Sequence, residues 1–207
     1  FLLEQKVKLL GVACNKASAV ALEGRVVAYQ VPWVGVIEPG ARREIEVSVN
    51  GRRGVVGKDG TIRSGAYERA LRRERADVVV HTAACPLFVP LAEEGWAGHE
   101  VARLTAREYL APLLAEGIDT LVLGCTHYPL IKPMLQEIVG PQVRLVDSAQ
   151  ETAKAVAAQL KTHRLQGQGQ PLSTPRYFVT DIPDRFERVG GAFLGEPLQG
   201  VTTVSLD

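Results

Sequence analysis

The sequence predicts an α/β protein made of two similar α/β domains, with parallel sheets flanked by helices and the active site in the cleft between the domains. Short apolar segments alternate with longer amphipathic segments, which is the order of strands and helices around a parallel sheet. Two segments that carry cysteines 111 positions apart (125 − 14 = 111) share one layout. The 207 residues, 46% of them hydrophobic, suffice for one large core or two small ones.

Each expected strand is a short apolar run, and each expected helix is a longer segment with apolar residues at helical spacing. The strands are expected at residues 9–13, 33–37, 54–57, 77–81, 120–124, 143–146, 176–180 and 201–206. The helices are expected at residues 17–28, 39–47, 61–73, 101–115, 130–139, 151–163 and from 183 onward. Thr61 is placed to cap its helix, and the Gln-, Gly- and Pro-rich residues 164–175 are expected to form a surface loop.

The charge balance argues against two classes of partner. Lys and Arg total 24 and Asp and Glu total 23, so the formal net charge is +1. No basic field is expected for nucleic acid or an anionic membrane, and the expected partner is a small molecule. No apolar run approaches the ~18 residues of a membrane-spanning helix. The apolar stretch after Phe1 ends at Glu4, so no signal peptide is expected.

The three cysteines make an odd count in a chain too long to be a disulfide scaffold. Free thiols in a reducing compartment are therefore expected, which predicts a cytoplasmic protein. Cys85, which precedes Pro86, is interpreted as a small core residue.

Residues 8–16 and 119–127 repeat one arrangement: a buried strand, a cysteine at its carboxyl end, and a polar pair that opens a helix. The N-terminus of that helix stabilises a thiolate and binds a substrate carboxylate. Asn15 and Thr126 are suited to cap the helix or to bind that carboxylate. A thiolate and a thiol on opposite faces of an α-carbon invert it without a cofactor, so Cys14 and Cys125 are the expected acid and base. His127 is placed to share a proton with Cys125.

Other interpretations of these residues remain open. A lone cysteine at a strand end is usually a packing residue, and His81, His99 and His163 are expected to be packed or solvated. A zinc site is not expected, because the only close pair of ligands is the Cys-x-His at 125–127. The competing functions are a non-catalytic small-molecule binding protein and a Cys-His hydrolase, the second of which leaves one cysteine without a role.

The two cysteine segments carry distinctive motifs, Val-Ala-Cys-Asn at 12–15 followed by Ala-Ser-Ala at 17–19, and Gly-Cys-Thr-His-Tyr-Pro at 124–129. These motifs resemble those of the aspartate/glutamate racemase family, and of glutamate racemases in particular. Further matches are residues 36–40, 60–67, 84–91 and 146–149 and the tail at 178–206, so the resemblance covers essentially the whole chain.

The resemblance implies two domains, residues 1–36 with 148–207 and residues 37–147. It also implies cofactor-independent and metal-free racemisation of L- and D-glutamate, which supplies D-glutamate for peptidoglycan. Cys125 would deprotonate L-glutamate and Cys14 D-glutamate, with His127 supporting Cys125. The residues implied to bind substrate are Asn15, Lys16, Thr61, Thr126 and His127. Glu93 is a further cleft candidate, although a surface role fits its sequence position equally. The sequence leaves a homodimer open.

Two departures from the family pattern bear on activity. The family opens with a strand ending in Asp-Ser and has a later Pro-Tyr-Gly, and these 207 residues contain neither that opening strand nor the Pro-Tyr-Gly. The sequence is therefore expected to lack that N-terminal segment, which would reduce activity. Lys16 and Lys58 stand where the family usually carries Thr, and these lysines are expected to impair or alter catalysis.

Overall fold

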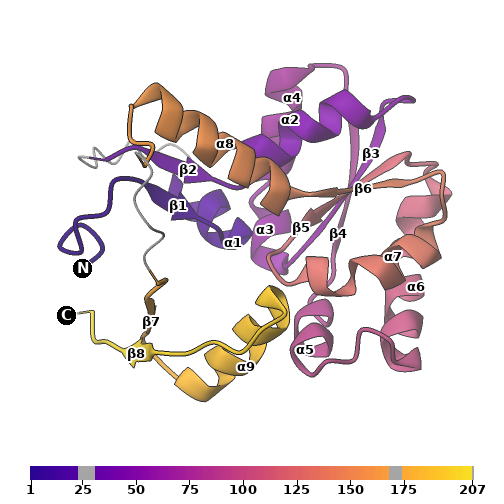
Figure 1. Cartoon of the computed structure of the whole chain (residues 1–207). Helices are drawn as coiled ribbons and strands as arrows, with labels where there is room; N and C mark the ends of the chain where they lie inside the picture. Colours follow the sequence, from indigo (N-terminus) through magenta and orange to yellow (C-terminus); the bar gives the residue numbers. More distant parts are fainter. Residues whose placement is uncertain (23–30, 168–173, 207) are drawn as a thin grey trace. The chain divides into compact units, whose positions relative to one another are not determined.

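A four-stranded parallel sheet forms the centre of residues 8–164, with its strands in the spatial order β4-β3-β5-β6 (Figure 1). The computed structural model describes residues 1–22, 31–167 and 174–206. Its contacts divide the chain into two units, residues 8–164 and residues 1–7 with 165–207. The strands of the central sheet are β3 (Arg52–Gly57), β4 (Val79–Ala84), β5 (Thr120–Gly124) and β6 (Arg144–Asp147).

Helices cover both faces of this sheet. One face is covered by α2 (Ile37–Val47), α4 (Ala66–Glu74) and α8 (Ser148–Thr162) (Figure 1). The other face is covered by α5 (Phe88–Glu93), α6 (Glu100–Ala115) and α7 (Lys132–Val139). Val122 of β5 packs in the hydrophobic core on the α2, α4 and α8 face, and its neighbours Leu121 and Leu123 pack in the core on the opposite face. Because successive side chains of a strand point to opposite faces and both faces are covered, residues 121–123 of β5 are all apolar.

A separate two-stranded parallel sheet lies in the same unit, where β1 (Leu10–Val12) pairs with β2 (Trp33–Gly35). After β1 come a short helix, α1 (Asn15–Ala17), and a π-helical segment, η1 (Ser18–Leu22). Residues 23–28, the rest of the helix expected at 17–28, lie outside the described residues.

The smaller unit contains β7 (Tyr177–Val179), α9 (Pro183–Leu194) and β8 (Val201–Thr203). The two strands pair in parallel, and α9 connects them. Every strand pair among the described residues is parallel. The structure therefore confirms the predicted α/β fold with parallel sheets flanked by helices.

The sequence-based predictions about helices were wrong in three respects. The helix expected at 61–73 is interrupted at Gly65, whose φ of 64° is left-handed, so that α3 (Asp59–Arg63) ends before α4 begins. Lys58 and not Thr61 is the N-cap of α3. The helix α5 was not predicted, since prolines normally break helices. Pro90, however, lies in the first turn, where the missing N–H costs no hydrogen bond.

Other boundaries move by a few residues. The strand expected at 77–81 begins at Val79 and continues to Ala84, because its last three residues pair with the apolar end of β3. The helix expected from 151 begins at Ser148, where the Asp147 carboxylate accepts a hydrogen bond from the N–H of Ala149 at 2.9 Å.

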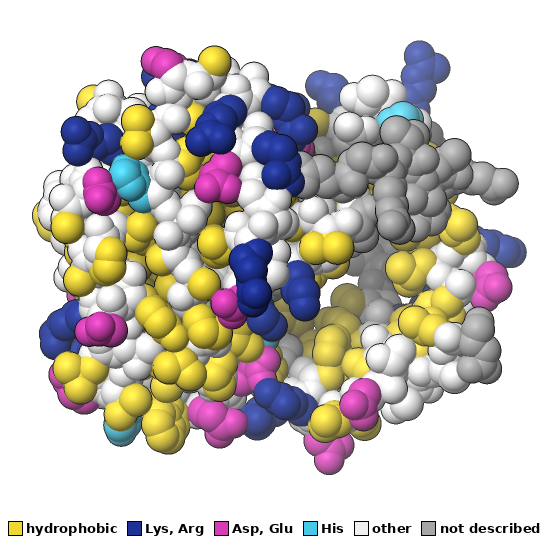
Figure 2. All heavy atoms as spheres, turned by 180° about the vertical axis from the view of Figure 1, so that it is seen from behind, with side chains coloured by type: hydrophobic (Ala, Val, Ile, Leu, Met, Phe, Trp, Pro, Cys, Tyr) yellow, Lys and Arg dark blue, Asp and Glu magenta, His cyan; other side chains and the backbone are white. Residues whose placement is uncertain are grey.

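Basic and acidic side chains are interspersed over the face of the larger unit that Figure 2 shows. That face therefore lacks the one-signed field that binds nucleic acid electrostatically. In the parts of the chain that the structure describes, no helix combines the length and the apolar character needed to span a bilayer.

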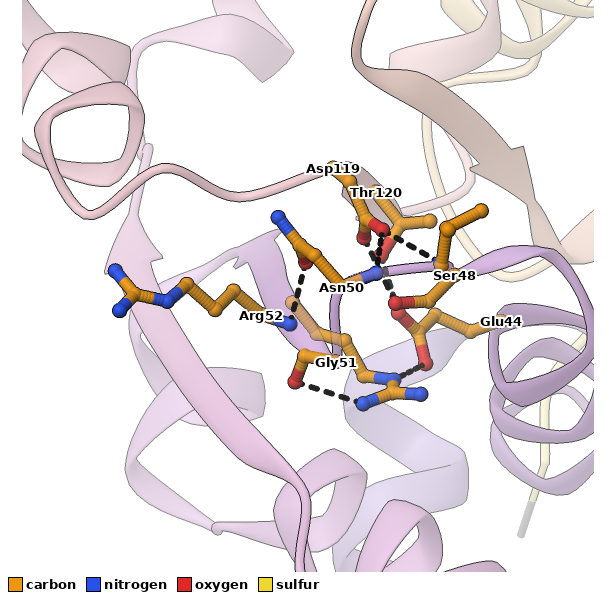
Figure 3. A network of polar contacts seen from close by, with 9 residues as sticks. Glu44, Ser48, Asn50, Gly51, Arg52, Asp119 and Thr120 are labelled. Atoms are coloured by element: carbon orange, nitrogen blue, oxygen red, sulfur yellow. Dashed lines mark hydrogen bonds and ion pairs between the residues drawn. The ribbon is translucent and has the colours of Figure 1, made fainter.

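A polar network occupies the amino ends of β3 and β5 (Figure 3). Arg53 is fully buried and donates from Nε to Glu44 Oε2 at 2.5 Å. Glu44 also accepts the hydroxyl of Thr120, and Arg53 donates to the carbonyl of Gly51 at 2.8 Å. These additional hydrogen bonds offset part of the cost of burying the ion pair, although Arg53 Nη2 has no partner among the described residues.

Asp119, the residue before β5, belongs to the same end of the sheet (Figure 3). Its carboxylate accepts the hydroxyl of Ser48 at 2.7 Å and the N–H groups of Val49 and Asn50 at 2.5 and 2.6 Å. Burial alone would raise the pKa of Asp119, but these donors and the charge of Arg53 hold that pKa below its ordinary value. Asp119 thus fastens the loop between α2 and β3 to the start of β5.

Candidate active site

The carboxyl ends of β3 and β5 lie next to each other. Gly57 pairs with Gly124 in the register of these strands, so Lys58 and Cys125 leave the sheet at the same edge. A Cβ atom at Gly124 would lie 2.7 Å from the carbonyl oxygen of Val56, so only glycine allows the strands to pack this closely. Ligands of parallel sheets bind at this edge.

Cys14 occupies the corresponding place after β1. It is the N-cap of α1, and its Sγ accepts the N–H of Ala17 at 3.5 Å. The side chain is exposed. Asn15, which the sequence suggested as a cap, is instead the first residue of the helix. The thiol therefore lies at a helix N-terminus, although the helix is short.

A direct contact joins the two cysteine segments. The hydroxyl of Thr126 donates to the carbonyl of Ala13 at 3.4 Å, which connects the residue after Cys125 to the residue before Cys14. The two cysteines are also close enough for the charge of Cys14 to affect the ionisation of Cys125. The structure thus brings together the two thiols that the repeated sequence layout singled out.

The environment of Cys125 acts on its ionisation in both directions. Burial raises the pKa of this thiol above its ordinary value, and a negative charge on Cys14 raises it further. The backbone N–H groups of His127 and Thr126 and the ammonium group of Lys58 oppose that rise. Cys125 is therefore mostly protonated at neutral pH, with donors in place that stabilise its thiolate.

The side chains of His127 and Glu93 are in contact near Cys125. The His127 Nε2 atom lies 2.8 Å from Glu93 Oε1, and the Glu93 side chain is only 11% exposed. Glu93 comes from α5, the helix that the sequence did not predict. Within residues 1–22, 31–167 and 174–206, no three His, Cys, Asp or Glu side chains are grouped as a metal ion would require.

Asn15 has a partner that the sequence did not indicate. The hydroxyl of Tyr67, on α4, donates to Asn15 Oδ1 at 2.6 Å, and both side chains are buried. Tyr67 also hydrogen-bonds Ser148. The only sequence signal was a tyrosine on the buried side of a helix, whose hydroxyl needs a partner. Asn15 Nδ2 has no hydrogen-bond partner among the described residues.

Lys16 and Thr61 complete the predicted set. Lys16 is exposed, and its aliphatic stem lies over Gly60, where an added Cβ would come within 2.9 Å of Lys16 Cε. Thr61 is 2% exposed, and its Cβ atom packs near Gly57. Cys85 is fully buried in the core, and burial raises the pKa of its thiol to about 12, which agrees with its interpretation as a packing residue.

The chain is similar to proteins of known family over its whole length. Residues 2–156 match the family model described as Asp/Glu/Hydantoin racemase. A glutamate racemase of Geobacter metallireducens is 55% identical over 207 residues, which are 100% of this chain and 77% of the relative.

Solved structures of glutamate racemases are also similar to this chain. A glutamate racemase isoform from Bacillus anthracis superposes with a TM-score of 0.92 at 36% identity, covering 99% of this chain and 77% of the other. A glutamate racemase from Francisella tularensis in complex with D-glutamate gives a TM-score of 0.91 at 34% identity, covering 100% of this chain and 77% of the other. With a family model over residues 2–156 and a relative at 55% identity, this chain belongs to the Asp/Glu/hydantoin racemase family.

Proposed function

We propose that this chain interconverts L- and D-glutamate without a cofactor, using Cys14 and Cys125 as the two acid–base groups. The observation that carries the proposal is the Thr126–Ala13 hydrogen bond, which brings the two cysteine segments together at the carboxyl ends of β1 and β5. Support for glutamate comes from the relatives named glutamate racemase, one of them solved with D-glutamate.

The proposed reaction balances without an external oxidant or reductant. With L-glutamate, the Cys125 thiolate takes the α-proton, and the electron pair of the C–H bond moves into the α-carboxylate. The Cys14 thiol then gives its proton to the opposite face of the α-carbon. One S–H bond forms and one breaks, which leaves Cys14 as the thiolate. D-glutamate reacts by the same steps in reverse order.

The remaining residues hold the reacting groups in place. The N–H groups of Thr126 and His127 bind the Cys125 sulfur and stabilise its thiolate. Glu93 accepts a hydrogen bond from the His127 imidazole and fixes its orientation. The substrate's polar groups are assigned to Asn15, Lys16, Thr61, Thr126 and His127.

The wider setting follows from the same proposal. Residues 1–36 with 148–207 and residues 37–147 would be the two domains that enclose the substrate. The protein would act in the cytoplasm and supply D-glutamate for peptidoglycan.

Sedimentation of the purified chain with and without glutamate would test whether it forms a homodimer.

The test is proton NMR of L-glutamate in D2O with the purified chain. Loss of the α-proton signal is expected, and both Cys14→Ala and Cys125→Ala should abolish it. Cys85→Ala is the matched control, because it removes a thiol from the core and should retain exchange. Exchange that survives either of the first two substitutions would contradict the two-thiol mechanism.

A second candidate is a non-catalytic amino-acid-binding protein on the same fold. It is favoured by Lys16 and Lys58, which replace the threonines usual in the family. Glutamate binding without α-proton exchange would support it. Exchange that appears in the Lys16→Thr/Lys58→Thr variant would show that the lysines impair catalysis, and unchanged turnover would remove that hypothesis.

A further inference from the structure

The buried side chain of Tyr67, on α4, contacts both cysteine segments. Its ring packs against Gly124, the residue before Cys125, where an added Cβ would come within 3.1 Å of Tyr67 Cε2. Its hydroxyl donates to Oδ1 of Asn15, the residue after Cys14, at 2.6 Å. One rigid side chain therefore joins the residue next to one thiol to the residue next to the other.

The segment after β1 depends on side-chain contacts for its position relative to the central sheet. β1 pairs with β2 in a separate sheet, so no strand register among the described residues fixes the distance between the two thiols. Thr126 supplies one link, its bond to the Ala13 carbonyl, but that bond is exposed and 3.4 Å long. The bond from Tyr67 to Asn15 is shorter and buried, and it is therefore the stronger of these two links.

The hydroxyl of Tyr67 is itself held in place. It also hydrogen-bonds Ser148, the first residue of α8. Gly40 of α2 faces the same point, since an added Cβ there would lie 3.5 Å from the hydroxyl oxygen of Tyr67 and 3.3 Å from Ser148 Cβ. Burial raises the pKa of Tyr67, so its hydroxyl stays protonated and keeps donating to Asn15 over the pH range in which thiols titrate.

Loss of this hydroxyl would leave Asn15 Oδ1 without its donor. The Asn15 side chain is 2% exposed, and its Nδ2 already lacks an acceptor among the described residues. Each buried polar atom without a partner costs about 1–3 kcal/mol. Movement of the segment outward would hydrate Asn15 and avoid this cost, and it would carry the exposed Cys14 with it. An error of about 1 Å in the position of a reacting group can lower a rate about 100-fold.

We infer that Tyr67 is a positioning residue for the two-thiol reaction, because it spans the two cysteine segments and sets the position of Cys14 relative to Cys125. It is assigned no contact with the substrate and acts through Asn15. The inference rests on the proposed function, which supplies the reaction. It adds a residue from α4, which lies outside both cysteine motifs.

A displaced Cys14 affects the two directions of the reaction differently. With L-glutamate, the Cys125 thiolate still removes the α-proton, but the Cys14 thiol is out of place to protonate the opposite face. The Cys125 thiol, once its S–H proton has exchanged with D2O, then returns a deuteron to the original face, which gives α-deuterated L-glutamate. With D-glutamate, the displacement slows proton removal by Cys14 and leaves Cys125 in place to complete the inversion. A general loss of stability would affect both directions alike.

The experiment incubates the whole chain with L- or D-glutamate in D2O and stops each reaction well before equilibrium. Chiral separation and mass spectrometry then give the ratio of α-deuterated substrate to α-deuterated product. Tyr67→Phe keeps the ring against Gly124 and removes only the hydroxyl. Thr120→Val is the matched control, because it also removes one buried hydroxyl hydrogen bond, to Glu44, at the amino end of β5.

From L-glutamate, Tyr67→Phe should raise this ratio at least about fivefold, and from D-glutamate the ratio should change less than about twofold. Thr120→Val should leave both ratios as in the parent. Ser148→Ala, which removes the other partner of the hydroxyl, should shift the ratio in the same direction and serves as the test if Tyr67→Phe does not fold. A ratio that is unchanged in Tyr67→Phe, or that rises equally from both enantiomers, would overturn the inference.

Amide hydrogen exchange of the peptide at 10–18 needs no turnover and separates this inference from the proposed function. Tyr67→Phe should speed amide exchange of that peptide at least about tenfold, and Thr120→Val should not. In a chain that racemises glutamate, the deuterium ratio decides, and an unchanged ratio keeps the function and rejects the inference. In a chain that does not, faster amide exchange keeps Tyr67 as the residue that positions the Cys14 segment and rejects racemisation, whereas unchanged amide exchange rejects both.

Discussion

Polar side chains at the two ends of the central sheet differ in how far they are hydrogen-bonded to one another. At the amino end, most polar side-chain atoms bond one another: Glu44 bonds Arg53, and Asp119 holds the loop before β3, while Arg53 Nη2 has no partner among the described residues. At the carboxyl end, Cys14 is exposed, and the ammonium groups of Lys16 and Lys58 have no ion-pair partner among the described residues. The central sheet therefore has a largely bonded network at its amino end, whereas Lys58 and Cys125 at its carboxyl end, with Cys14 and Lys16 from the segment after β1, form an open set of polar groups.

This difference indicates where stability and chemistry are located. Polar groups that bond each other contribute to the free energy of unfolding, and removal of one leaves its partner buried and unpaired. Groups left open contribute little to folding but are available to a ligand. Substitutions at the amino end should thus change stability, and those at the carboxyl end should change binding and exchange.

The largest effect is expected at Cys14. Cys14→Ala should lower the rate of α-proton exchange at least about 1,000-fold, because one of two essential proton carriers is lost. The free energy of unfolding should change by less than about 0.5 kcal/mol, since the side chain is exposed. Urea unfolding and NMR exchange on the same preparation check both values. A strongly destabilised Cys14→Ala variant would contradict the view that groups at the carboxyl end contribute little to stability.

At the amino end, Arg53→Met should lower the free energy of unfolding by about 3–5 kcal/mol, because it leaves the Glu44 carboxylate buried without its counterion. Glutamate affinity should be unaffected in the protein that remains folded. The double variant Glu44→Met/Arg53→Met removes both charges and should cost less than the single change. A double variant less stable than Arg53→Met would show that the pair acts through packing and not through charge.

Asp119→Asn should cost about 1–3 kcal/mol at pH 7, since the amide replaces one acceptor oxygen with a donor. The pKa of Asp119 is lowered on folding, so its contribution is fully present above the unfolded pKa of about 3.9 and is lost as pH falls through the folded value. Urea unfolding from pH 7 to 3 should show the difference from the parent shrinking. Asp77→Asn, at an exposed aspartate, should show no such trend.

The smallest effect is expected from Glu93→Gln, which keeps a hydrogen-bond acceptor for His127 but removes the charge. A positioning role predicts that kcat falls about tenfold while KM for glutamate changes less than about twofold. Unfolding free energy should move by less than about 1 kcal/mol. A raised KM with unchanged kcat would instead mean that Glu93 serves substrate binding.

Much of the fold could be predicted from local patterns. The strand expected at 120–124 is observed with the same bounds, because a short apolar run that ends at a glycine is typical of a strand buried on both faces. The helix from 183 also begins where Pro183 indicated. The break at Gly65 could not be predicted, since it depends on a left-handed φ that glycine permits but does not require.

The site was predictable where a layout is repeated, as at Cys14 and Cys125, or where its residues are close in sequence, and not where distant residues share no pattern. Cys125 and His127 are two positions apart and follow a recognisable strand. The partner of Asn15 is Tyr67, 52 positions later. The partner of His127 is Glu93, which lies on α5, a helix that was not predicted because of its prolines. Such pairs depend on tertiary packing, which periodicity and spacing do not encode.

The pairing of Gly57 with Gly124 has an evolutionary consequence. Any side chain at Gly124 would collide with the backbone of β3, so this position tolerates almost no mutation. Lys58 and Cys125, one residue further on, have left the ladder and are free of that constraint. The limit between the sterically constrained strands and the unconstrained segments after them thus falls between two consecutive residues. A single codon change at position 58 can therefore exchange an ammonium group for a hydroxyl without disturbing the strands, so the chemistry of this edge can change while the sheet stays the same.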